Sequence, residues 1–311
     1  MARGAELAAG IICGSMENAE NAQLQGAFER AGVRAVQVLP EDIAIGVSLG
    51  NDFFHDKVVI DDIPGFVIRG IGFTTLARSF YRLDLLYALE RRGKHLINSA
   101  RATETAMNKA LASVALDAAG IPTPATLVTE NLKHAMSAFD KLGGDVLVKP
   151  VYGSQGVGIF RMQDRGLAEN VFLELFRNGH VLYMQAFHPW SAPLGMAINN
   201  PFDVRVIVIG DEVVAAMIRE GTAIDRWKTN IHQGAMPRPY TPSREVRDLS
   251  LASARALGLD IAGIDLLHSA RAGGWVVLEV NCAPGWTGLS RTCNVDIPAM
   301  IAGHYRRVLT R

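Results

Sequence analysis

The chain has 311 residues, of which 49% are hydrophobic, enough for a core in two domains or in three small lobes around one cleft. Lysine and arginine total 31, and aspartate and glutamate also total 31, so the formal net charge is zero. Without a basic excess or a basic stripe, the composition argues against nucleic-acid binding. No run of about 18 apolar residues occurs, which argues against a membrane-spanning helix.

The cysteines and the first residues point to the compartment. Cys13, Cys282 and Cys293 form no CxxC pair, and their odd number argues against a disulfide framework. Met1–Ala5 lead into an apolar run without a cleavage pattern, so we interpret the start as part of the fold rather than as a signal peptide. These features predict a cytoplasmic protein.

Strands and helices alternate through the first hundred residues. Apolar, β-branched runs predict strands at 7–13, 33–39, 58–60, 65–71 and 95–98, and helical periodicity predicts helices at about 17–30 and 76–92. Alternation of this kind is typical of a parallel sheet covered by helices. Residues 1–100 are therefore predicted to form a first lobe of an α/β fold.

Two further lobes are predicted beyond it. For the second lobe, residues 101–186, the sequence predicts helices at 103–119, 132–142 and 167–178 and strands at 125–129, 145–149, 157–162 and 181–187. The third lobe, residues 187–311, is predicted to be rich in strands, at 203–209, 212–219, 260–267 and 275–281. One helix is expected to begin at Thr241, with Pro242 in its first turn.

A glycine-rich segment, Gly153-Ser154-Gln155-Gly156-Val157-Gly158, separates two predicted strands. It lacks the Gly-Lys-Ser/Thr of a Walker A loop, it does not open a helix as a dinucleotide fingerprint does, and it has no Gly-x-Ser-x-Gly elbow. It is either a simple hairpin turn or a flap whose backbone N–H groups cover a polyphosphate. Lys149 ends the preceding strand, as either a solvated edge lysine or a cation for the phosphates.

Three oxygen-bearing side chains lie on the last two predicted strands. Alternation along 275–281 places Val277, Glu279 and Asn281 on one face, with Glu279 and Asn281 ~7 Å apart at Cα. Asp265 stands alone in the apolar neighbouring strand. Burying such groups without partners is costly, so they form either a magnesium site or a hydrogen-bonded polar pocket. No His or Cys spacing indicates zinc.

Taken in order, these pieces resemble the RimK-like family of ATP-grasp ligases, of the alpha-L-glutamate ligase type. The resemblance covers residues 95–311 well and the first lobe in architecture only. It rests on Asn108-Lys109, Val148-Lys149, the glycine-rich segment, Asp203-Val204-Arg205, the segment 210–216, Trp227-Lys228-Thr229-Asn230, His232, Asp265, Glu279-Val280-Asn281 and Pro284-Gly285.

The resemblance implies a fold and a set of roles. An N-terminal lobe would precede two ATP-grasp lobes that clasp ATP. Lys109, Lys149 and the glycine-rich segment, with Gly153, Ser154, Gln155, Gly156 and Gly158, would hold the ATP phosphates. Catalytic roles would fall to Arg205, Arg219, Lys228 and Asn230, the three cations neutralising the γ-phosphate and the acyl phosphate. Asp265, Glu279 and Asn281 would carry Mg or Mn, as two ions. Arg205 and Arg219 lie inside apolar strands, where a buried cation needs an anionic partner such as phosphate.

The activity implied is ATP-dependent joining of an amine to a carboxylate through an acyl phosphate. The amine would be glutamate or another amino acid, and the acceptor a carboxylate on a coenzyme or protein, near Arg69, Lys228 and the loop 282–291. The alternatives are a ligase of another ATP-grasp branch, of the dipeptide or lysine-pathway carrier type, or a nucleotide-binding regulator without activity. A homo-oligomer is also compatible with the family.

One departure from the family concerns the segment that would hold adenine, Gln185, Ala186, Phe187 and His188. Relatives carry Glu, an aromatic residue and Ile after the strand that ends here, whereas this chain has Ala186-Phe187-His188-Pro189. In the fold that it resembles, backbone carbonyl and N–H groups form the hydrogen bonds with adenine. We therefore expect the carbonyl of Ala186 to accept a hydrogen bond and the N–H of His188 to donate one, whatever their side chains.

Overall fold

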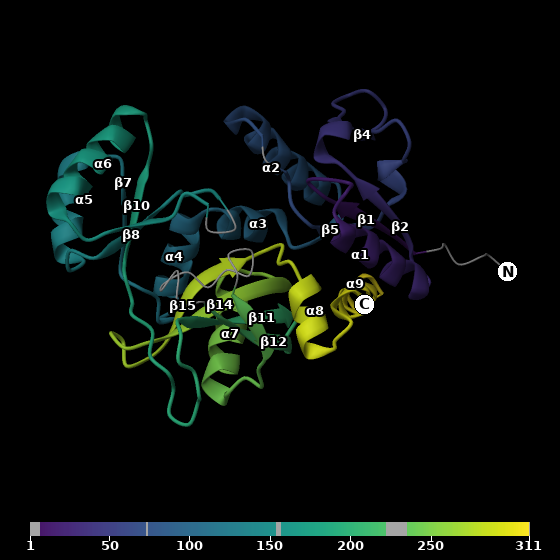
Figure 1. The fold of residues 1–311 in the computed structure, drawn as a ribbon. Helices are drawn as coiled ribbons and strands as arrows, with labels where there is room; N and C mark the ends of the chain where they lie inside the picture. Colours follow the sequence, from purple (N-terminus) through teal and green to yellow (C-terminus); the bar gives the residue numbers. More distant parts are fainter. Residues whose placement is uncertain (1–6, 73, 154–156, 222–234, 311) are drawn as a thin grey trace.

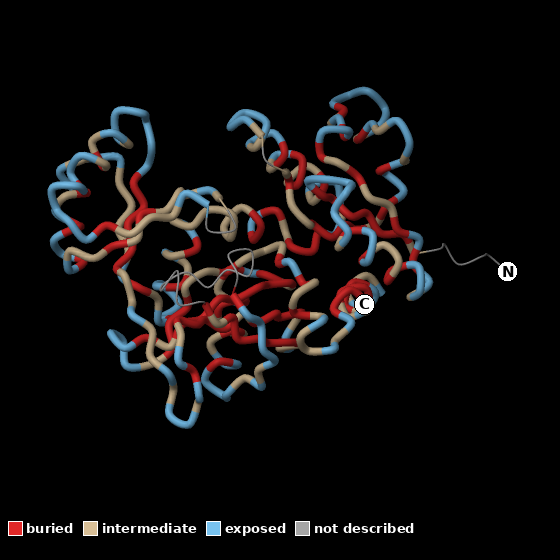
Figure 2. The backbone as a smooth tube through the Cα atoms, in the orientation of Figure 1, coloured by how far each residue is buried: buried red, intermediate tan, exposed pale blue. Residues whose placement is uncertain are grey.

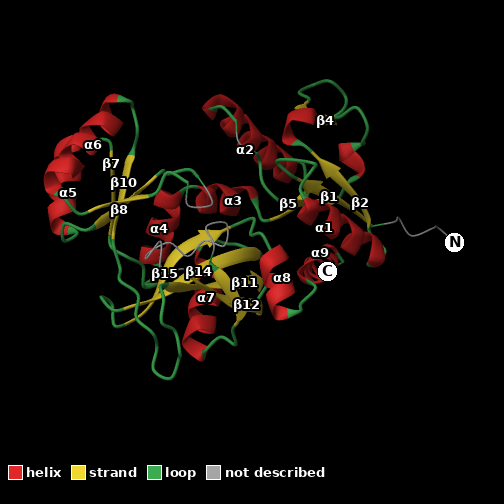
Figure 3. Cartoon of the chain, viewed as in Figure 1, coloured by secondary structure: helices red, strands yellow, loops and turns green. Residues whose placement is uncertain are grey.

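The computed structural model describes residues 7–72, 74–153, 157–221 and 235–310. Figure 1 shows an N-terminal lobe in purple and a central lobe in teal, both standing on a large sheet in green and yellow. Figure 3 shows the same layers as strands flanked by helices. Among the described residues, no helix combines the length and the apolar character needed to cross a bilayer.

The N-terminal lobe is a parallel sheet in the order β2-β1-β5-β6, as predicted. Its elements are β1 (Ala8–Ile12), α1 (Ala19–Arg30), β2 (Arg34–Val38), β3 (Ala44–Ile45), β4 (Phe53–Phe54), β5 (Gly65–Ile68), α2 (Leu76–Arg91) and β6 (His95–Ile97). The predicted strand at 58–60 is wrong. Ile60–Asp62 form a single 3-10 turn, in which Ile60 is buried and the two aspartates face solvent.

The central sheet is antiparallel, in the order β7-β10-β8-β9. Its elements are β7 (Thr126–Thr129), α5 (Leu132–Lys141), β8 (Val146–Lys149), β9 (Phe160–Met162), α6 (Arg165–Arg177) and β10 (Leu182–Ala186). The helices cover one face, where Val146, Val148 and Met184 pack with Phe139 and Phe172. By alternation, the opposite face presents Lys149 and Gln185. The strand predicted from Val157 begins only at Phe160.

The C-terminal sheet has the order β13-β12-β11-β14-β15 and is antiparallel throughout. Its strands are β11 (Phe202–Ile209), β12 (Glu212–Glu220), β13 (Met236–Pro239), β14 (Ile261–Ser269) and β15 (Gly274–Asn281). Figure 2 shows how strongly burial is concentrated here. One face packs on α7 (Arg244–Ala256), α3 (Ala100–Met107) and α4 (Lys109–Ala118). α7 starts later than predicted because Ser243, not Thr241, caps it, with its Oγ 3.3 Å from the N–H of Val246.

The other face of this sheet has an apolar part and a charged part, at opposite ends of the strands. Towards one end Ile207, Ile209 and Met217 pack with the N-terminal lobe and with α8 (Thr287–Cys293) and α9 (Ile297–Leu309), two helices that the sequence did not predict. Towards the other end the same alternation presents Arg205 and Asp203, so the charged residues lie together beside the central lobe.

The single helix predicted at 103–119 is wrong, because the chain breaks at Asn108. This residue is extended (φ −98°, ψ 104°), and its Oδ1 accepts hydrogen bonds from the N–H groups of Ala110 (3.0 Å) and Leu111 (3.2 Å). Asparagine favours helix N-caps for this reason. The break makes Lys109 the first residue of α4, where its N–H donates to the carbonyl of Val151, 3.1 Å away.

Candidate active site

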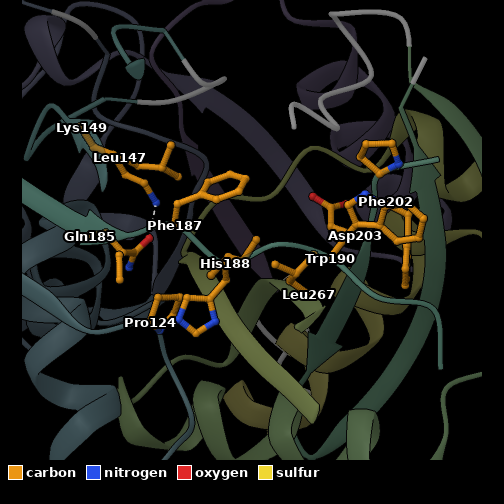
Figure 4. A pocket seen from close by; sticks show the side chains of 13 residues that line it. Pro124, Leu147, Lys149, Gln185, Phe187, His188, Trp190, Phe202, Asp203 and Leu267 are labelled. Carbon is orange, nitrogen blue, oxygen red and sulfur yellow. Dashed lines mark hydrogen bonds between the residues drawn. The ribbon is translucent and has the colours of Figure 1, made fainter. Parts of the chain in front are cut away.

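A pocket opens between the cleft face of the central sheet and the C-terminal sheet. Figure 4 shows its lining side chains, which come from both sheets and from the segment joining them. They are Pro124, Leu147, Lys149, Gln185, Ala186, Phe187, His188, Trp190, Pro201, Phe202, Asp203, Leu267 and Leu278. The four residues predicted to hold adenine are therefore brought together in one pocket with the predicted phosphate ligand Lys149.

Of the three backbone N–H groups in Ala186-Phe187-His188, one has no acceptor among the described residues. The N–H of Ala186 donates to the carbonyl of Ala125 (2.8 Å) and that of Phe187 to Asp145 (2.9 Å), while the N–H of His188 donates to none of the described residues. The imidazole of His188 is engaged elsewhere, with its Nδ1 2.8 Å from Oγ of Ser269. Burial, with a smaller contribution from Arg271, lowers the pKa of His188. This arrangement supports the backbone account of adenine binding, which stays a prediction.

Lys149 is a half-buried cation in the wall of the pocket. Its Nζ donates to Oε1 of Gln185 at 2.6 Å, the contact drawn in Figure 4. Burial lowers the pKa of Lys149 to about 8, an effect that Glu279 opposes and that the nearby Lys109 adds to. A lysine in this state gains most from a polyanion that replaces the lost hydration.

Lys109 joins three of the predicted functional elements. Its Nζ lies 3.1 Å from Oε1 of Glu279, a predicted metal ligand, and donates to the carbonyl of Gly153 at 2.6 Å, where the glycine-rich segment begins. At the other end of that segment Gly158 has φ +73°, a conformation that glycine adopts without strain. The predicted residues Ser154, Gln155, Gly156, Lys228 and Asn230 lie outside the described part of the chain.

Two arginines and two aspartates form a compact charged cluster on β11, β12 and β14. Arg205 pairs with Asp265 across the strands and binds both carboxylate oxygens, the second at 2.7 Å. Arg219 binds both oxygens of Asp203, each at 2.6 Å, and approaches Asp265 at 3.1 Å. Each arginine thus has a carboxylate partner directly opposite it on the neighbouring strand, Asp265 for Arg205 and Asp203 for Arg219. A role of the two arginines towards phosphate stays a prediction.

The charges in this cluster stabilise one another. Burial alone would raise the pKa of Asp265, but Arg205 and Arg219 outweigh it and hold that pKa below its ordinary value. Burial opposes the charge on Arg219 as well, yet Asp203 and Asp265 raise its pKa. The cluster therefore stays ionised, and a carboxylate that keeps its charge in a buried place can serve as a ligand for a cation.

The three predicted metal ligands are neighbours in the sheet. Asp265 pairs with Glu279, and Asn281 pairs with Gly263. The amide nitrogen of Asn281 lies 3.4 Å from the carbonyl of Gly263, which leaves its Oδ1 for a ligand. Two carboxylates and an amide oxygen suit Mg²⁺ or Mn²⁺. In the described ranges no group of three or more His, Cys, Asp or Glu is placed to hold a metal.

A β-bulge corrects the predicted face of β15. Asp265 pairs with Glu279 but the next residue, Leu266, pairs with Val277, so Leu278 is the extra residue. Val277 consequently packs in the core beneath the sheet and not beside Glu279, whereas Leu278 lines the pocket. Simple alternation misses such an insertion because a bulge turns two successive residues towards one side.

Arg69, expected near the acceptor, is enclosed within the protein. Its guanidinium donates to Oε2 of Glu20 (3.0 Å) and to the carbonyl of Pro284 (2.9 Å), and it stacks 4.0 Å from the centre of the Trp286 ring. Its side chain is 5% exposed, so it supports the segment after Asn281 from behind.

Residues 106–304 match the RimK-like ATP-grasp domain family. The chain belongs to this family. Two relatives illustrate its range. The tetrahydromethanopterin:alpha-L-glutamate ligase of Methanococcus maripaludis is 35% identical over 281 residues, which are 88% of this chain and 90% of the relative. The ribosomal protein bS6–L-glutamate ligase of Salmonella paratyphi B is 34% identical over 224 residues, 71% of this chain and 70% of the relative.

Solved structures share the whole architecture of this RimK-like protein. The ATP-grasp ligase PsnB, in complex with a phosphomimetic variant of its minimal precursor, Mg and ADP, superimposes with a TM-score of 0.74 at 21% identity, covering 98% of this chain and 99% of PsnB. A RimK domain ATP-grasp protein from Sphaerobacter thermophilus gives 0.70 at 21% identity, covering 95% and 98%. The predicted α/β ATP-grasp fold is confirmed, and so is the enzyme class, an ATP-dependent ligase that forms carbon–nitrogen bonds.

Proposed function

We propose that this RimK-like ligase adds L-glutamate to a carboxylate of a small coenzyme, of the pterin type that the Methanococcus relative acts on. The observation that carries the choice of acceptor is the extent of the similarity. A match over 88% of this chain has to include most of the N-terminal lobe, whereas the match to the bS6 ligase covers 71%. The N-terminal lobe adjoins the segment 282–287 beyond the predicted metal ligands, where an acceptor would enter.

The first step forms an acyl phosphate. An oxygen of the acceptor carboxylate attacks the γ-phosphorus of ATP, and the bond to the β-phosphate oxygen breaks to release ADP. Lys109 and Lys149 hold the phosphates, and Arg205, Arg219, Lys228 and Asn230 surround the transferred group in this proposal. A divalent cation pair bound by Asp265, Glu279 and Asn281 would supply further neutralisation of the phosphate charge. Such a reaction needs positioning and charge stabilisation rather than a protein nucleophile.

The second step forms the amide. The neutral amine of glutamate attacks the acyl carbon, the bond to phosphate breaks, and the amine loses a proton as inorganic phosphate departs. Exclusion of water protects the acyl phosphate in the meantime. In this proposal the glycine-rich segment, which begins at Gly153 where Lys109 donates to the carbonyl, would cover the phosphates during this interval.

A coupled ADP-release assay tests the proposal. The enzyme, ATP and Mg²⁺ are combined with L-glutamate, D-glutamate, L-glutamine or L-aspartate, and with a carboxylate-bearing pterin coenzyme or a carboxyl-terminal bS6 peptide. We expect ADP release only with L-glutamate and the coenzyme, together with a mass gain of one glutamyl residue. ADP release that requires the peptide would show that the acceptor is a protein and not a coenzyme. ADP release with a different amino acid would show that the amine is not L-glutamate. ATP binding without ADP release would indicate a nucleotide-binding regulator.

A further inference from the structure

The cleft face of the central sheet carries a polar network beneath Lys149. Strand register places Lys149 opposite Tyr183 and Gln185 opposite Thr126. Residues directly opposite in an antiparallel pair, and residues two apart along a strand, share a face. Lys149, Gln185, Tyr183 and Thr126 therefore form one patch, and Ser113 of α4 closes it from the side.

One arrangement of the hydrogens satisfies every side chain in this network. Ser113 donates its single hydroxyl hydrogen to the carbonyl of Lys109 (2.9 Å), so its Oγ accepts from the hydroxyl of Tyr183, 2.8 Å away. Tyr183, having given its hydrogen to Ser113, accepts from Nε2 of Gln185 at 3.2 Å. Thr126 likewise donates to the carbonyl of Pro124 (2.8 Å) and accepts from the same Nε2 at 3.1 Å.

This arrangement fixes the amide of Gln185. The hydroxyl oxygens of Tyr183 and Thr126 accept the two amide hydrogens of Gln185. The amide oxygen therefore faces Lys149, which can only donate. In the reversed orientation the amide would present donors to the ammonium group of Lys149. Gln185 is 1% exposed, and its two donor hydrogens are already engaged. Its amide therefore reaches a nucleotide through Lys149 and not by direct donation.

We propose that Gln185 is a positioning residue that aims the ammonium group of Lys149 at the phosphates of ATP. One of the three ammonium hydrogens is held by the amide oxygen at 2.6 Å, and the other two are thereby directed away from the sheet into the pocket. The network ends on the carbonyl of Lys109, so the side chains of Gln185, Tyr183 and Ser113 join Lys149 to the backbone of the second predicted phosphate lysine. This inference rests on the proposed role of Lys149 as a phosphate ligand.

The other charged groups around Lys149 come from the facing elements. They are Glu279 on β15, Asp265 on β14 and Lys109 on α4. All three act through space, whereas Gln185 is the neutral group in hydrogen-bond contact. Removing the amide oxygen should thus change the direction of the lysine more than the charge around it.

A double-mutant cycle in ATP binding tests the inference, using the full chain without glutamate or acceptor. Affinity for ATP is measured by calorimetry for Gln185→Leu, Lys149→Met and the double variant. We expect Gln185→Leu to weaken ATP binding about tenfold, equivalent to about 1.4 kcal/mol. The double variant should bind within about twofold of Lys149→Met alone. Gln163→Leu, an exposed glutamine in the same lobe, should bind like the parent.

Two more variants keep the test decisive. Gln185→Glu retains an acceptor but adds a charge, and it should move the loss of ATP affinity at alkaline pH to higher pH, which a purely structural residue would not do. If Gln185→Leu does not fold, Tyr183→Phe removes one acceptor of the amide and should weaken ATP about threefold in the parent and not at all in Lys149→Met. Additive losses in either cycle would overturn the role of Gln185. Unchanged affinity in Lys149→Met would instead overturn the proposed phosphate ligand.

Discussion

At the scale of single residues, the site is assembled from charges that neutralise one another. Lys109 is paired with Glu279, Arg205 with Asp265, and Arg219 with Asp203. Separating such a pair leaves a charge without its partner, so each member holds the other in place. The consequence is a site whose cations and anions are positioned before ATP arrives.

The pKa of Lys149, about 8, predicts a pH dependence of ATP binding. Phosphate favours the ammonium form, so the pKa rises on binding. Below pH 8 Lys149 is already charged, so it adds no pH dependence to ATP binding. Above pH 8 the lysine must take up a proton when ATP binds, and the affinity for ATP should fall by up to about tenfold per pH unit. Calorimetry in two buffers of different ionisation enthalpy measures the uptake. Lys149→Met should abolish it, and a parent enzyme without such uptake would contradict the prediction.

Glu279→Gln tests the metal assignment. The amide can still accept from Lys109 and keeps the volume, so the protein should fold with an unchanged Tm, but it is a poor ligand for a hard cation. Losing a residue that only supports a metal ligand costs up to about 100-fold in activity. Glu279 is predicted to be a ligand itself, so we expect kcat to fall at least about 100-fold. Steady-state kinetics across a range of Mg²⁺ concentrations measure this. Glu169→Gln, on the exposed side of α6, is the control. Near-parental activity at low Mg²⁺ would reject the assignment.

At the scale of elements, three local irregularities build the site. The break at Asn108 places Lys109 at the start of a helix. The bulge at Leu278 turns Leu278 and Glu279 towards the cleft. Just after the end of β10, the N–H of His188 has no acceptor among the described residues. Irregular positions of this kind concentrate where a fold performs chemistry.

The segment after β10 gives a prediction about ATP affinity. His188→Pro removes the N–H expected to bind adenine and should cost ~1–3 kcal/mol, about 10- to 100-fold in ATP affinity. His188→Ala keeps that N–H and loses only the contact with Ser269, so its effect should be mild. Ala186→Glu should likewise change the KM for ATP only slightly. Equal losses in His188→Pro and His188→Ala would mean that the imidazole itself contacts the nucleotide.

Much of this could be predicted from sequence because alternation and spacing act locally. The strands carrying Arg205, Asp265 and Glu279 were recognisable from their apolar neighbours, and the order of motifs indicated the family. The bulge was not predictable, since the register between β14 and β15 depends on packing across the whole sheet. Asparagine is a common helix N-cap, but the periodicity on both sides of Asn108 predicted a continuous helix. The partners of the arginines followed from pairing between strands, which spacing along the chain does not specify.

At the scale of the whole molecule, the N-terminal lobe supports the far end of β15, the strand that carries two of the predicted metal ligands. Oε1 of Glu20 on α1 accepts from the N–H groups of Trp286 (2.7 Å) and Thr287 (2.8 Å), and its other oxygen binds Arg69. Asn98, at the end of the N-terminal sheet, donates to the carbonyl of Cys282 at 2.8 Å. The segment that follows Asn281 is therefore anchored on the first lobe.

Glu20→Ala should release that segment. It removes the cap of α8 and leaves Arg69 buried without its anionic partner, a loss of about 3 kcal/mol in the free energy of unfolding. Urea denaturation measures it, and the KM for the acceptor should rise with the loss of order. Glu17→Ala, on the exposed turn before α1, is the matched control. A stability change below about 0.5 kcal/mol would show that the anchor contributes nothing.

The last helix has a bearing on how the protein is made. The hydroxyl of Tyr305 on α9 donates to the carbonyls of Ala8 (2.6 Å) and Gly65 (3.0 Å), and the same helix shares a core with Ile11 and Phe28 of the first lobe. During synthesis the first lobe emerges long before α9, and domains usually fold in that order. Here the first lobe must wait, with part of its apolar surface uncovered, until α9 has left the ribosome.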